Sequence, residues 1–402
     1  MPSNITLKKL RYLPICVAAA CAFSAQASQQ NFDSRSFAMG NIGVSTADYL
    51  TAPFHNPALV ARFNEDDAVA LLFPSFGVDA NDPTDIIDNV EDFSDIYDEF
   101  KNISNPTEDD AQKVINQLLL VQGNYAQVQA GTQLAVAIPS NTIAVNIFAQ
   151  AYADALVFAD IDENDLDPLK IINLDLDSKA LTMGVVVTEF GVSLAKSYKT
   201  PTGQFYYGVS PKYQKVNTIN YIADIDNYEF DDWDDDRYQS DESNFNIDIG
   251  FAYQHNAGFG FGIVGKNLIK NSYQTEVIEG VKGVYELSPT YTISANYQNR
   301  FVIAAIDIAL NESVGYKDLT GTINAYDTDN TNRQIAGVGV ELFPESWFRF
   351  RAGYQTDLSD NTDDSFTAGL GFSPFDVFHF DLSGRYADDR NMGVSLQTRF
   401  TF

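Results

Sequence analysis

From Asn124 to the C-terminus, the chain alternates apolar and polar residues in segments of about ten residues, separated by clusters of Gly, Asn, Asp and Pro. The last segment is the clearest case. One set of its side chains is mostly apolar: Met392, Val394, Leu396, Thr398, Phe400 and Phe402. The intervening set is small or polar: Gly393, Ser395, Gln397, Arg399 and Thr401. This period of two predicts antiparallel strands with one apolar and one polar face.

The pattern predicts an all-β fold with 14 strands, an even number that suits a closed barrel without unpaired edges. The predicted strands lie near residues 68–76, 125–138, 141–161, 183–198, 203–225, 243–255, 259–268, 289–298, 301–311, 333–343, 347–357, 364–373, 377–387 and 391–402. The segments 141–161 and 203–225 exceed the roughly ten residues needed to cross a bilayer, so we expect them to project beyond it.

A soluble sandwich would give the same alternation, so other features must choose between a protein core and lipid as the apolar partner. Charged residues occupy the polar face, which predicts lumen-facing positions at Arg349, Arg351, His379, Asp381 and Arg385. Aromatic residues gather towards strand ends, as membrane barrels place them: Trp347, Phe348, Phe378, Phe380 and Tyr386. The final alternating strand ends on Phe400 and Phe402, which resembles the assembly signal of bacterial outer-membrane barrels. Together these features favour a transmembrane barrel.

Two regions depart from the strand pattern. Residues 83–121 carry apolar residues at three- and four-residue spacing on either side of Asn105-Pro106, which predicts two amphipathic helices outside the membrane. The segment from Gln29 to Phe63 has neither period. It is either a disordered tail or a segment packed inside the barrel.

The N-terminus has the pattern of a secretory signal at residues 1–27, with basic residues, an apolar run from Tyr12 to Phe23 and Ala25-Gln26-Ala27 at the cleavage site. Both cysteines, Cys16 and Cys21, lie inside it, so cleavage would leave a chain without thiols. Lipoprotein processing at Cys21 is the alternative, although Ala18-Ala19-Ala20 lacks the usual bulky aliphatic residue.

Charge excludes one class of partner, because 55 acidic against 25 basic residues argue against nucleic-acid binding. The run from Asp224 to Glu242 holds ten carboxylates, which we interpret as a solvated loop rather than a cation site. Asp160, Asp162 and Asn164 begin like a calcium loop, but the glycine and the final Glu are missing. We therefore expect neither a metal nor a cofactor.

Enzyme chemistry is also not expected. After residue 27 only His55, His255 and His379 can act as a neutral-pH base, and no hydrolase, zinc-protease or phosphate-loop motif is present. A hydrolase would require Ser or Asp groups within hydrogen-bonding reach of His379 or His255.

The N-terminal segment reads Ser34-Arg35-Ser36-Phe37-Ala38-Met39-Gly40-Asn41-Ile42-Gly43-Val44, then Ala47-Asp48-Tyr49-Leu50-Thr51-Ala52-Pro53-Phe54-His55-Asn56-Pro57-Ala58-Leu59. It resembles the outer-membrane proteins of the conjugal transfer TraF family and, more distantly, the FadL-type long-chain fatty-acid transporters. Lys266-Asn267-Leu268 and the run from Ala352 to Leu382 fit the same resemblance. Asn41 stands where relatives often have glycine, and the helical insertion is not a FadL feature, so no ligand-pocket residue is carried over.

The resemblance implies a barrel over residues 64–402 with the helical insertion at 83–121, plugged by a lumenal hatch at 28–63. The hatch and gating residues would be Arg35, Met39, Gly40, Gly43, Asp48, Asn56 and Pro57. Gly40 and Gly43 would permit tight turns. Asn56-Pro57 would form a turn that satisfies its own backbone hydrogen bonds. Arg35 would be buried against carboxylates of the wall. A tail made of ordinary turns is the alternative. A thioredoxin-like factor that shares the name TraF needs thiols, which the processed chain would lack.

The implied function is a passive channel or transporter for hydrophobic or amphipathic molecules in the outer membrane of a Gram-negative bacterium, with an association with conjugative transfer. Its partners would be outer-membrane lipid and lipopolysaccharide, the barrel assembly machinery, a hydrophobic ligand, and conjugation or secretion components. The alternative is a scaffold that transports nothing and docks a secretion or surface complex through acidic loops and the helical insertion.

Overall fold

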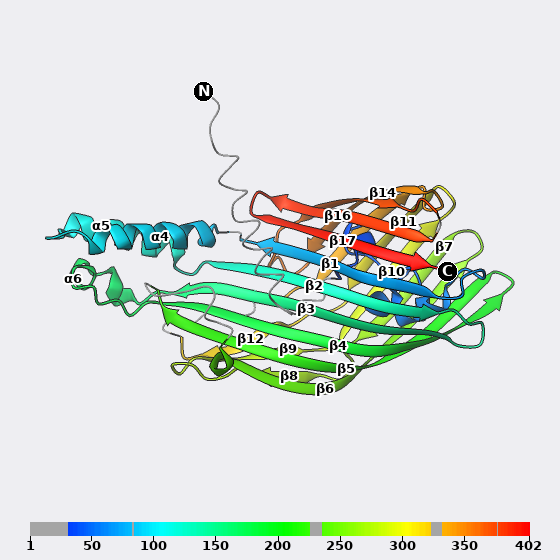
Figure 1. Cartoon of the computed structure of the whole chain (residues 1–402), viewed down its shortest axis with the longest axis horizontal. Coiled ribbons are helices and arrows are strands. Elements are labelled where there is room, and N and C mark those ends of the chain that lie inside the picture. The colour runs from blue at the N-terminus through cyan, green and yellow to red at the C-terminus, as the bar shows by residue number, and fades with distance from the viewer. Residues whose placement is uncertain (1–30, 83, 226–234, 323–331, 376) are drawn as a thin grey trace, which may run out of the picture.

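The computed structural model describes residues 31–82, 84–225, 235–322, 332–375 and 377–402. The predicted signal at 1–27 and residues 226–234 of the acidic run lie outside the described residues. In the part described, 14 antiparallel strands close into a barrel in which β1 pairs with both β2 and β17 (Figure 1). The predicted barrel and strand number are therefore confirmed. The strands are β1 (Ala70–Asn81), β2 (Tyr125–Ile138), β3 (Ala144–Asp160), β4 (Lys179–Thr200), β5 (Gly203–Asp224), β6 (Gln239–His255), β7 (Phe259–Lys266), β10 (Thr290–Gln298), β11 (Val302–Ala309), β13 (Ile335–Leu342), β14 (Phe348–Asp357), β15 (Ser365–Phe372), β16 (Phe378–Asp388) and β17 (Asn391–Thr401).

Strand β1 differs most from its predicted limits, because it continues to Asn81 rather than ending near residue 76. Its alternation is interrupted at Pro74, where the register shifts against both β17 and β2. Proline has no backbone N–H to give to the ladder, so within a sheet it favours a bulge. Phe73 and Phe76 consequently both face outward, although the two residues between them would place them on opposite faces of a regular strand.

The outer surface carries the expected apolar belt. On β5 and β6, aromatic pairs bound this belt at both rims: Tyr213 and Phe245 have ring centroids 5.5 Å apart, and Phe205 and Tyr253 are 4.5 Å apart. Beyond Tyr213 the outer face becomes polar, with an ion pair of 2.9 Å between Lys215 and Asp241. The long strands therefore project past an apolar belt of the kind that faces lipid in membrane barrels.

The connections differ strongly at the two ends of the barrel. Those at the end that holds the C-terminus are short turns, whereas most of those at the other end are long, and they carry most of the helices (Figure 1). The helices here are α4 (Ile86–Lys101), α5 (Glu108–Val121), η2 (Glu163–Leu166), α6 (Pro168–Ile172) and η4 (Asp236–Tyr238). Helices α4 and α5 lie on either side of Asn105-Pro106. They share an apolar core with α6 and with Ala126, Ala159 and Ala180 near the strand ends.

A second, three-stranded sheet lies inside the barrel, made of β8 (Asn271–Gln274), β9 (Lys282–Leu287) and β12 (Tyr316–Thr320). Sequence analysis missed these strands, which are too short to show a period. Asn220 on the inner face of β5 donates Nδ2 hydrogen bonds of 2.9 Å to the carbonyl oxygens of Glu276 and Val281. Met183 and the tyrosines of this sheet share an apolar core. The sheet therefore covers the inner face of β3, β4 and β5 at the loop end of the lumen.

Among the described residues, no helix is both long and apolar enough to cross a bilayer.

The belt can be tested at Ile249, which is 50% exposed on the outer face of β6 between Phe245 and Phe251. We expect Ile249→Arg to lower the free energy of unfolding in phospholipid vesicles by about 2–4 kcal/mol, because a guanidinium is costly near the midplane of a bilayer. Chemical denaturation measures this. Ser243→Arg, on the same face beyond the belt, is the control and should stay within about 0.5 kcal/mol of wild type. Equal effects of both changes would contradict a lipid-facing belt.

Candidate functional site

Residues 31–63, called here the lumenal segment, pack inside the barrel (Figure 1). The segment holds three short helices, α2 (Ser34–Phe37), α3 (Ala52–His55) and η1 (Pro57–Ala61). Asp33 caps α2 by accepting a hydrogen bond of 3.1 Å from the Ser36 N–H. Asn56 caps η1 in the same way, accepting a hydrogen bond of 3.0 Å from the Ala58 N–H. Such local caps let a chain without long elements satisfy its own backbone in a confined space.

A chain of alternating charges, all buried except the half-buried Asp48, ties the lumenal segment to the wall. Its members, in order of contact, are Arg35, Glu341, Arg351, Asp381, Arg399 and Asp48. Arg35 Nε lies 3.0 Å from Glu341 Oε2, and Arg351 Nη1 lies 2.6 Å from Asp381 Oδ1. Both ends of this chain, Arg35 and Asp48, belong to the lumenal segment. Because each buried charge is paired, removing one partner leaves an uncompensated charge, at a typical cost of about 3–5 kcal/mol.

Wall side chains also bind the backbone of the segment. Asp307 Oδ2 on β11 accepts hydrogen bonds of 2.8 Å from the Gly43 N–H and 2.9 Å from the Val44 N–H. Asn146 on β3 donates Nδ2 hydrogen bonds of 3.0 Å to the carbonyl oxygens of Tyr49 and Leu50. These contacts satisfy buried backbone groups that form no regular secondary structure.

Two predicted glycines lie where a side chain has no room. Gly40 has a φ of +72°, and a Cβ there would lie 2.5 Å from the Tyr354 carbonyl oxygen. A Cβ on Gly43 would lie 2.2 Å from His55 Nδ1. Met39 is fully buried and packs against Ile42. Glycine at position 40 therefore lets the lumenal segment lie close to the wall, and glycine at position 43 lets two parts of the segment pack closely together.

Phe32 is anchored in a socket that sequence analysis did not find. Gly77 on β1 and Gly131 on β2 face each other across the two strands. A Cβ on Gly77 would lie 2.3 Å from Phe32 Cδ1, and one on Gly131 would lie 2.2 Å from Phe32 Cδ2. The two glycines thus leave a hollow that the buried ring fills. The hollow can be recognised only from the pairing of Gly77 with Gly131 across the two strands.

The predicted lumen-facing residues lie on the inner side of the wall but do not form one cluster. Arg351 and Asp381 belong to the charge chain, whereas Arg385 pairs with Asp79 on β1. Arg349 donates an Nε hydrogen bond of 2.9 Å to the Pro344 carbonyl oxygen.

His379 has a serine within reach, since its Nδ1 lies 2.7 Å from Ser373 Oγ. Its Nε2 lies 3.0 Å from Thr401 Oγ1, a hydroxyl rather than the carboxylate that orients a catalytic imidazole. Ser373 is only 1% exposed, so a substrate does not reach its hydroxyl. His255 Nδ1 accepts a hydrogen bond of 3.0 Å from the Ala257 N–H in a strand turn. The geometry around these histidines fits polar networks better than a hydrolase.

The aromatic residues at the C-terminus lie at the rim of the barrel. Phe400 lies beside Phe378, with centroids 5.5 Å apart, and stacks on Phe402 at 6.4 Å. Phe402 is 54% exposed, and its N–H donates a hydrogen bond of 2.9 Å to the Val69 carbonyl oxygen. Their role as an assembly signal stays a prediction.

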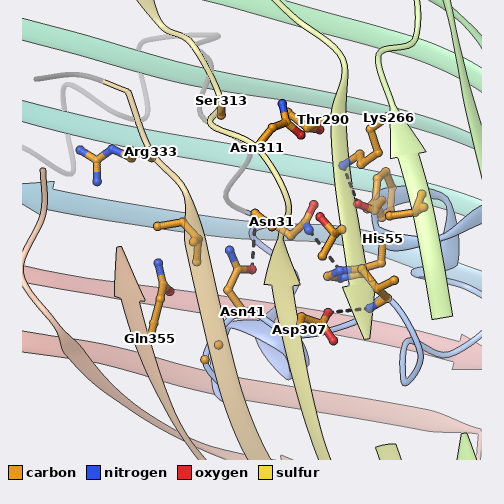
Figure 2. Close-up of a pocket in the computed structure, with 18 residues that line it drawn as sticks. Asn31, Asn41, His55, Lys266, Thr290, Asp307, Asn311, Ser313, Arg333 and Gln355 are labelled. Atoms are coloured by element: carbon orange, nitrogen blue, oxygen red, sulfur yellow. Dashed lines mark hydrogen bonds between the residues drawn. The ribbon is translucent and has the colours of Figure 1, made fainter. Parts of the chain in front are cut away.

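A cavity of about 100 Å³ remains between the lumenal segment and the wall strands β7, β10, β11, β13 and β14 (Figure 2). His55 borders it and contacts Asp33 through Nε2, while Nδ1 lies 3.1 Å from Asn31 Nδ2. Burial raises the pKa of Asp33, but the charge of His55 and hydrogen bonds from His55 and Ser36 outweigh it, so the pKa lies well below its ordinary value.

The described residues contain no group of three or more side chains suited to a metal ion. At the segment that begins like a calcium loop, Asp162 Oδ1 accepts a hydrogen bond of 2.8 Å from the Asn164 N–H and caps η2. The buried Asp165 carboxylate accepts hydrogen bonds of 2.8 Å and 2.7 Å from the Asp177 and Ser178 N–H groups. These carboxylates serve the loop backbone.

A sequence model of the family described as "F plasmid transfer operon, TraF, protein" matches residues 53–308, more than half of the chain. Curated protein sequences give no match. The toluene transporter TbuX of Ralstonia pickettii has a similar structure, with a TM-score of 0.52 at 11% identity over 93% of this chain and 99% of that one. A deletion mutant of the monoaromatic hydrocarbon channel TodX gives a TM-score of 0.54 at 10% identity over 91% of this chain and 97% of that one. The toluene transporter TodX of P. putida gives 0.50 at 10% identity over 93% and 97%. These neighbours are transporters and channels rather than enzymes, and at such identities they show a shared fold.

The Phe32 socket generates a test of how the lumenal segment is held. We expect Gly131→Leu to expel the ring and to speed amide hydrogen exchange in residues 34–38 about ten- to a hundredfold, because burying a Phe side chain is worth about 1.5–3 kcal/mol. Phe32→Ala should do the same without altering the wall. Gly384→Leu is the control, since a Cβ there meets no atom closer than 3.7 Å. Wild-type exchange rates in both Phe32 and Gly131 variants would refute this account of the anchor.

Proposed function

Because the chain belongs to the family described as "F plasmid transfer operon, TraF, protein", we propose that it is an outer-membrane channel or transporter for hydrophobic or amphipathic molecules. In this proposal the lumenal segment is the hatch and its displacement opens the path. One observation carries the proposal: the interior of a closed barrel of 14 strands is occupied by the segment that precedes β1, and polar contacts hold this segment to the wall.

The contacts of the hatch support displacement as the opening step. Arg35, Asp48 and the Gly43 N–H meet the wall through charged or polar groups, which water can solvate once the contacts break. The barrel is closed by backbone pairing among its own strands, so it keeps its shape when the hatch moves.

A gap in the wall is the second route. The bulge of β1 at Pro74 interrupts its pairing on both sides, and the socket of Phe32 lies three residues further along the same strand, at Gly77. Withdrawal of Phe32 would leave the wall thin at this point, because two facing glycines carry no side chains.

The location follows from the same features. An apolar belt with aromatic rims and a signal-like N-terminus support insertion into the outer membrane of a Gram-negative bacterium. Barrels of this class place short turns in the periplasm and long loops outside, so α4 and α5 would face the exterior. Lipopolysaccharide and the barrel assembly machinery are the partners this location implies. The family description supports a link to conjugative transfer.

The hatch is tested by deletion of residues 28–60 after the signal. In proteoliposomes we expect the deleted form to show higher conductance and faster uptake of a small aromatic hydrocarbon such as toluene than the full chain, because the lumen loses its plug. A form lacking residues 83–121 is the control and should behave like the full chain. If deletion of 28–60 changes neither conductance nor uptake, the hatch does not gate a path.

A docking scaffold is the second candidate, and one observation favours it. The helical insertion at 83–121 contains ten acidic residues and two lysines, and α4 and α5 extend beyond the ends of the strands (Figure 1). An exposed acidic projection of this kind attracts basic surfaces at long range.

Pull-down from extracts of cells that express conjugation or secretion components tests the scaffold. We expect capture of a basic partner by the full chain, loss of that partner from the form lacking residues 83–121, and weaker capture at high salt. Equal capture by both forms would rule out docking through the helical insertion.

A further inference from the structure

At the loop end of the barrel, side chains from separate parts of the wall meet across the lumen. Arg333 precedes β13, and its backbone pairs with that of Ser313 through hydrogen bonds of 3.1 Å and 2.8 Å. Its Nη2 donates a hydrogen bond to the amide oxygen of Gln127 on β2. On the shorter way around the barrel, β14, β15, β16, β17 and β1 lie between β13 and β2. The contact therefore crosses the lumen instead of following the wall.

A second contact crosses beside the first. The hydroxyl of Tyr125, also on β2, donates a hydrogen bond of 3.4 Å to the carbonyl oxygen of Asn361 in the turn between β14 and β15. Asn361 Nδ2 in turn donates a hydrogen bond of 2.7 Å to the carbonyl oxygen of Asn332, the neighbour of Arg333. The two crossing contacts thus belong to one connected group. We call Arg333, Gln127, Tyr125 and Asn361 the cross-lumen latch.

Gln127 is held in the orientation that the latch needs. Asp154 on β3 accepts hydrogen bonds of 2.7 Å and 2.8 Å from Gln127 Nε2 and one of 3.0 Å from Gln129 Nε2. An amide whose nitrogen is bound to a carboxylate turns its oxygen towards a donor on the other side, here the guanidinium of Arg333. The Asp154 carboxylate also attracts Arg333 electrostatically. Asp154 is therefore a positioning residue of the latch.

The latch lies on the loop side of the cavity of about 100 Å³. His55 and Asn41 of the lumenal segment border this cavity on one side, and Arg333, Ile335 and Gly337 border it from the region of β13. Figure 2 shows Arg333 on the side away from His55, with its guanidinium turned away from the cavity. The three-stranded sheet covers the inner face of β3, β4 and β5 at this end. The latch bridges the part of the lumen between β2 and β13 that remains.

We propose that the cross-lumen latch is a second gate of the passage, in series with the lumenal segment and on the loop side of the cavity. This inference rests on the proposed channel and identifies the first barrier that a molecule meets from the loop side. The latch consists of a few side-chain contacts, and side chains change rotamer much faster than a chain segment moves. It therefore slows passage without abolishing it, and the form lacking residues 28–60 still conducts.

The experiment measures how fast a thiol inside the cavity is labelled. Thr292→Cys places this thiol on β10, in the lining of the cavity. The purified full chain in detergent is treated with a positively charged and, separately, a negatively charged methanethiosulfonate reagent, and the parent chain is the blank. With the latch intact we expect labelling about a hundredfold slower than at Ser104→Cys in the exposed connection between α4 and α5, because the reagent waits for the latch to open.

Arg333→Ala and Gln127→Ala, each combined with Thr292→Cys, should speed labelling about ten- to a hundredfold, since each removes a hydrogen bond to a charged group. Both reagents should gain. Loss of positive charge alone would speed the cationic reagent and slow the anionic one. Arg390→Ala is the matched control, because this arginine lies at the same end of the barrel but pairs with Asp85 outside the latch, at 3.0 Å. It should leave both rates unchanged.

Heat-modifiable gel mobility checks that each variant retains the barrel. If Arg333→Ala misfolds, Gln127→Ala carries the test, because it opens the latch without changing any charge. Unchanged labelling in every folded latch variant overturns the inference. Opposite effects on the two reagents, or labelling as fast as at Ser104→Cys with the latch intact, overturn it as well.

The labelling does not depend on transport, so the two proposals fail separately. Faster labelling in the latch variants, with no toluene uptake by the form lacking residues 28–60, would refute the channel and leave the latch as a closure of the lumen. Uptake by that form, with unchanged labelling in the latch variants, would do the reverse.

Discussion

The pairing of β1 with β17 is the interaction on which the rest of the molecule depends. It joins the first and last strands of the sheet, and the backbone of Phe402 continues the seam to Val69. Without it, two strand edges would leave N–H and C=O groups unpaired in hydrocarbon, where each costs several kcal/mol. Closure also fixes which face of every strand points inward, so the polarity of the interior follows from the alternation along the strands.

The strands turn polar side chains into the interior of the barrel, and many of these side chains are charged. Many inward arginines and carboxylates are paired within the wall or with the lumenal segment, as in the chain from Arg35 to Asp48. The overall excess of acidic residues is therefore a property of the loops and of the outside, while the interior stays near balance. The lumenal segment supplies partners for charges of the wall, because Arg35 pairs with Glu341 and Asp48 pairs with Arg399.

Sequence reasoning recovered the strands because lipid on one side and polar filling on the other impose a strict period of two. Parity along a strand is also the basis on which Arg351, Asp381 and Arg385 are predicted to face the lumen, and all three side chains are buried. Sequence reasoning did not find their partners. Arg385 on β16 meets Asp79 on β1 across β17, and the two residues are more than 300 positions apart in the sequence. Glu341 pairs with Arg35, which belongs to a segment without any period. The Phe32 socket and the lumenal sheet were missed because short pieces of chain whose shape comes from the wall carry no pattern of their own.

The position of the lumenal segment in the sequence has a consequence for biogenesis. The segment is made first and precedes β1, yet it bonds to residues of β17, the strand made last: the Ser34 N–H donates to Gln397 Oε1 at 2.9 Å. The three-stranded sheet covers part of the inner wall at the loop end of the lumen, which narrows the barrel on that side. We therefore expect the lumenal segment to take its place while β17 pairs with β1, so that the last strand closes the barrel around the part of the chain that was made first.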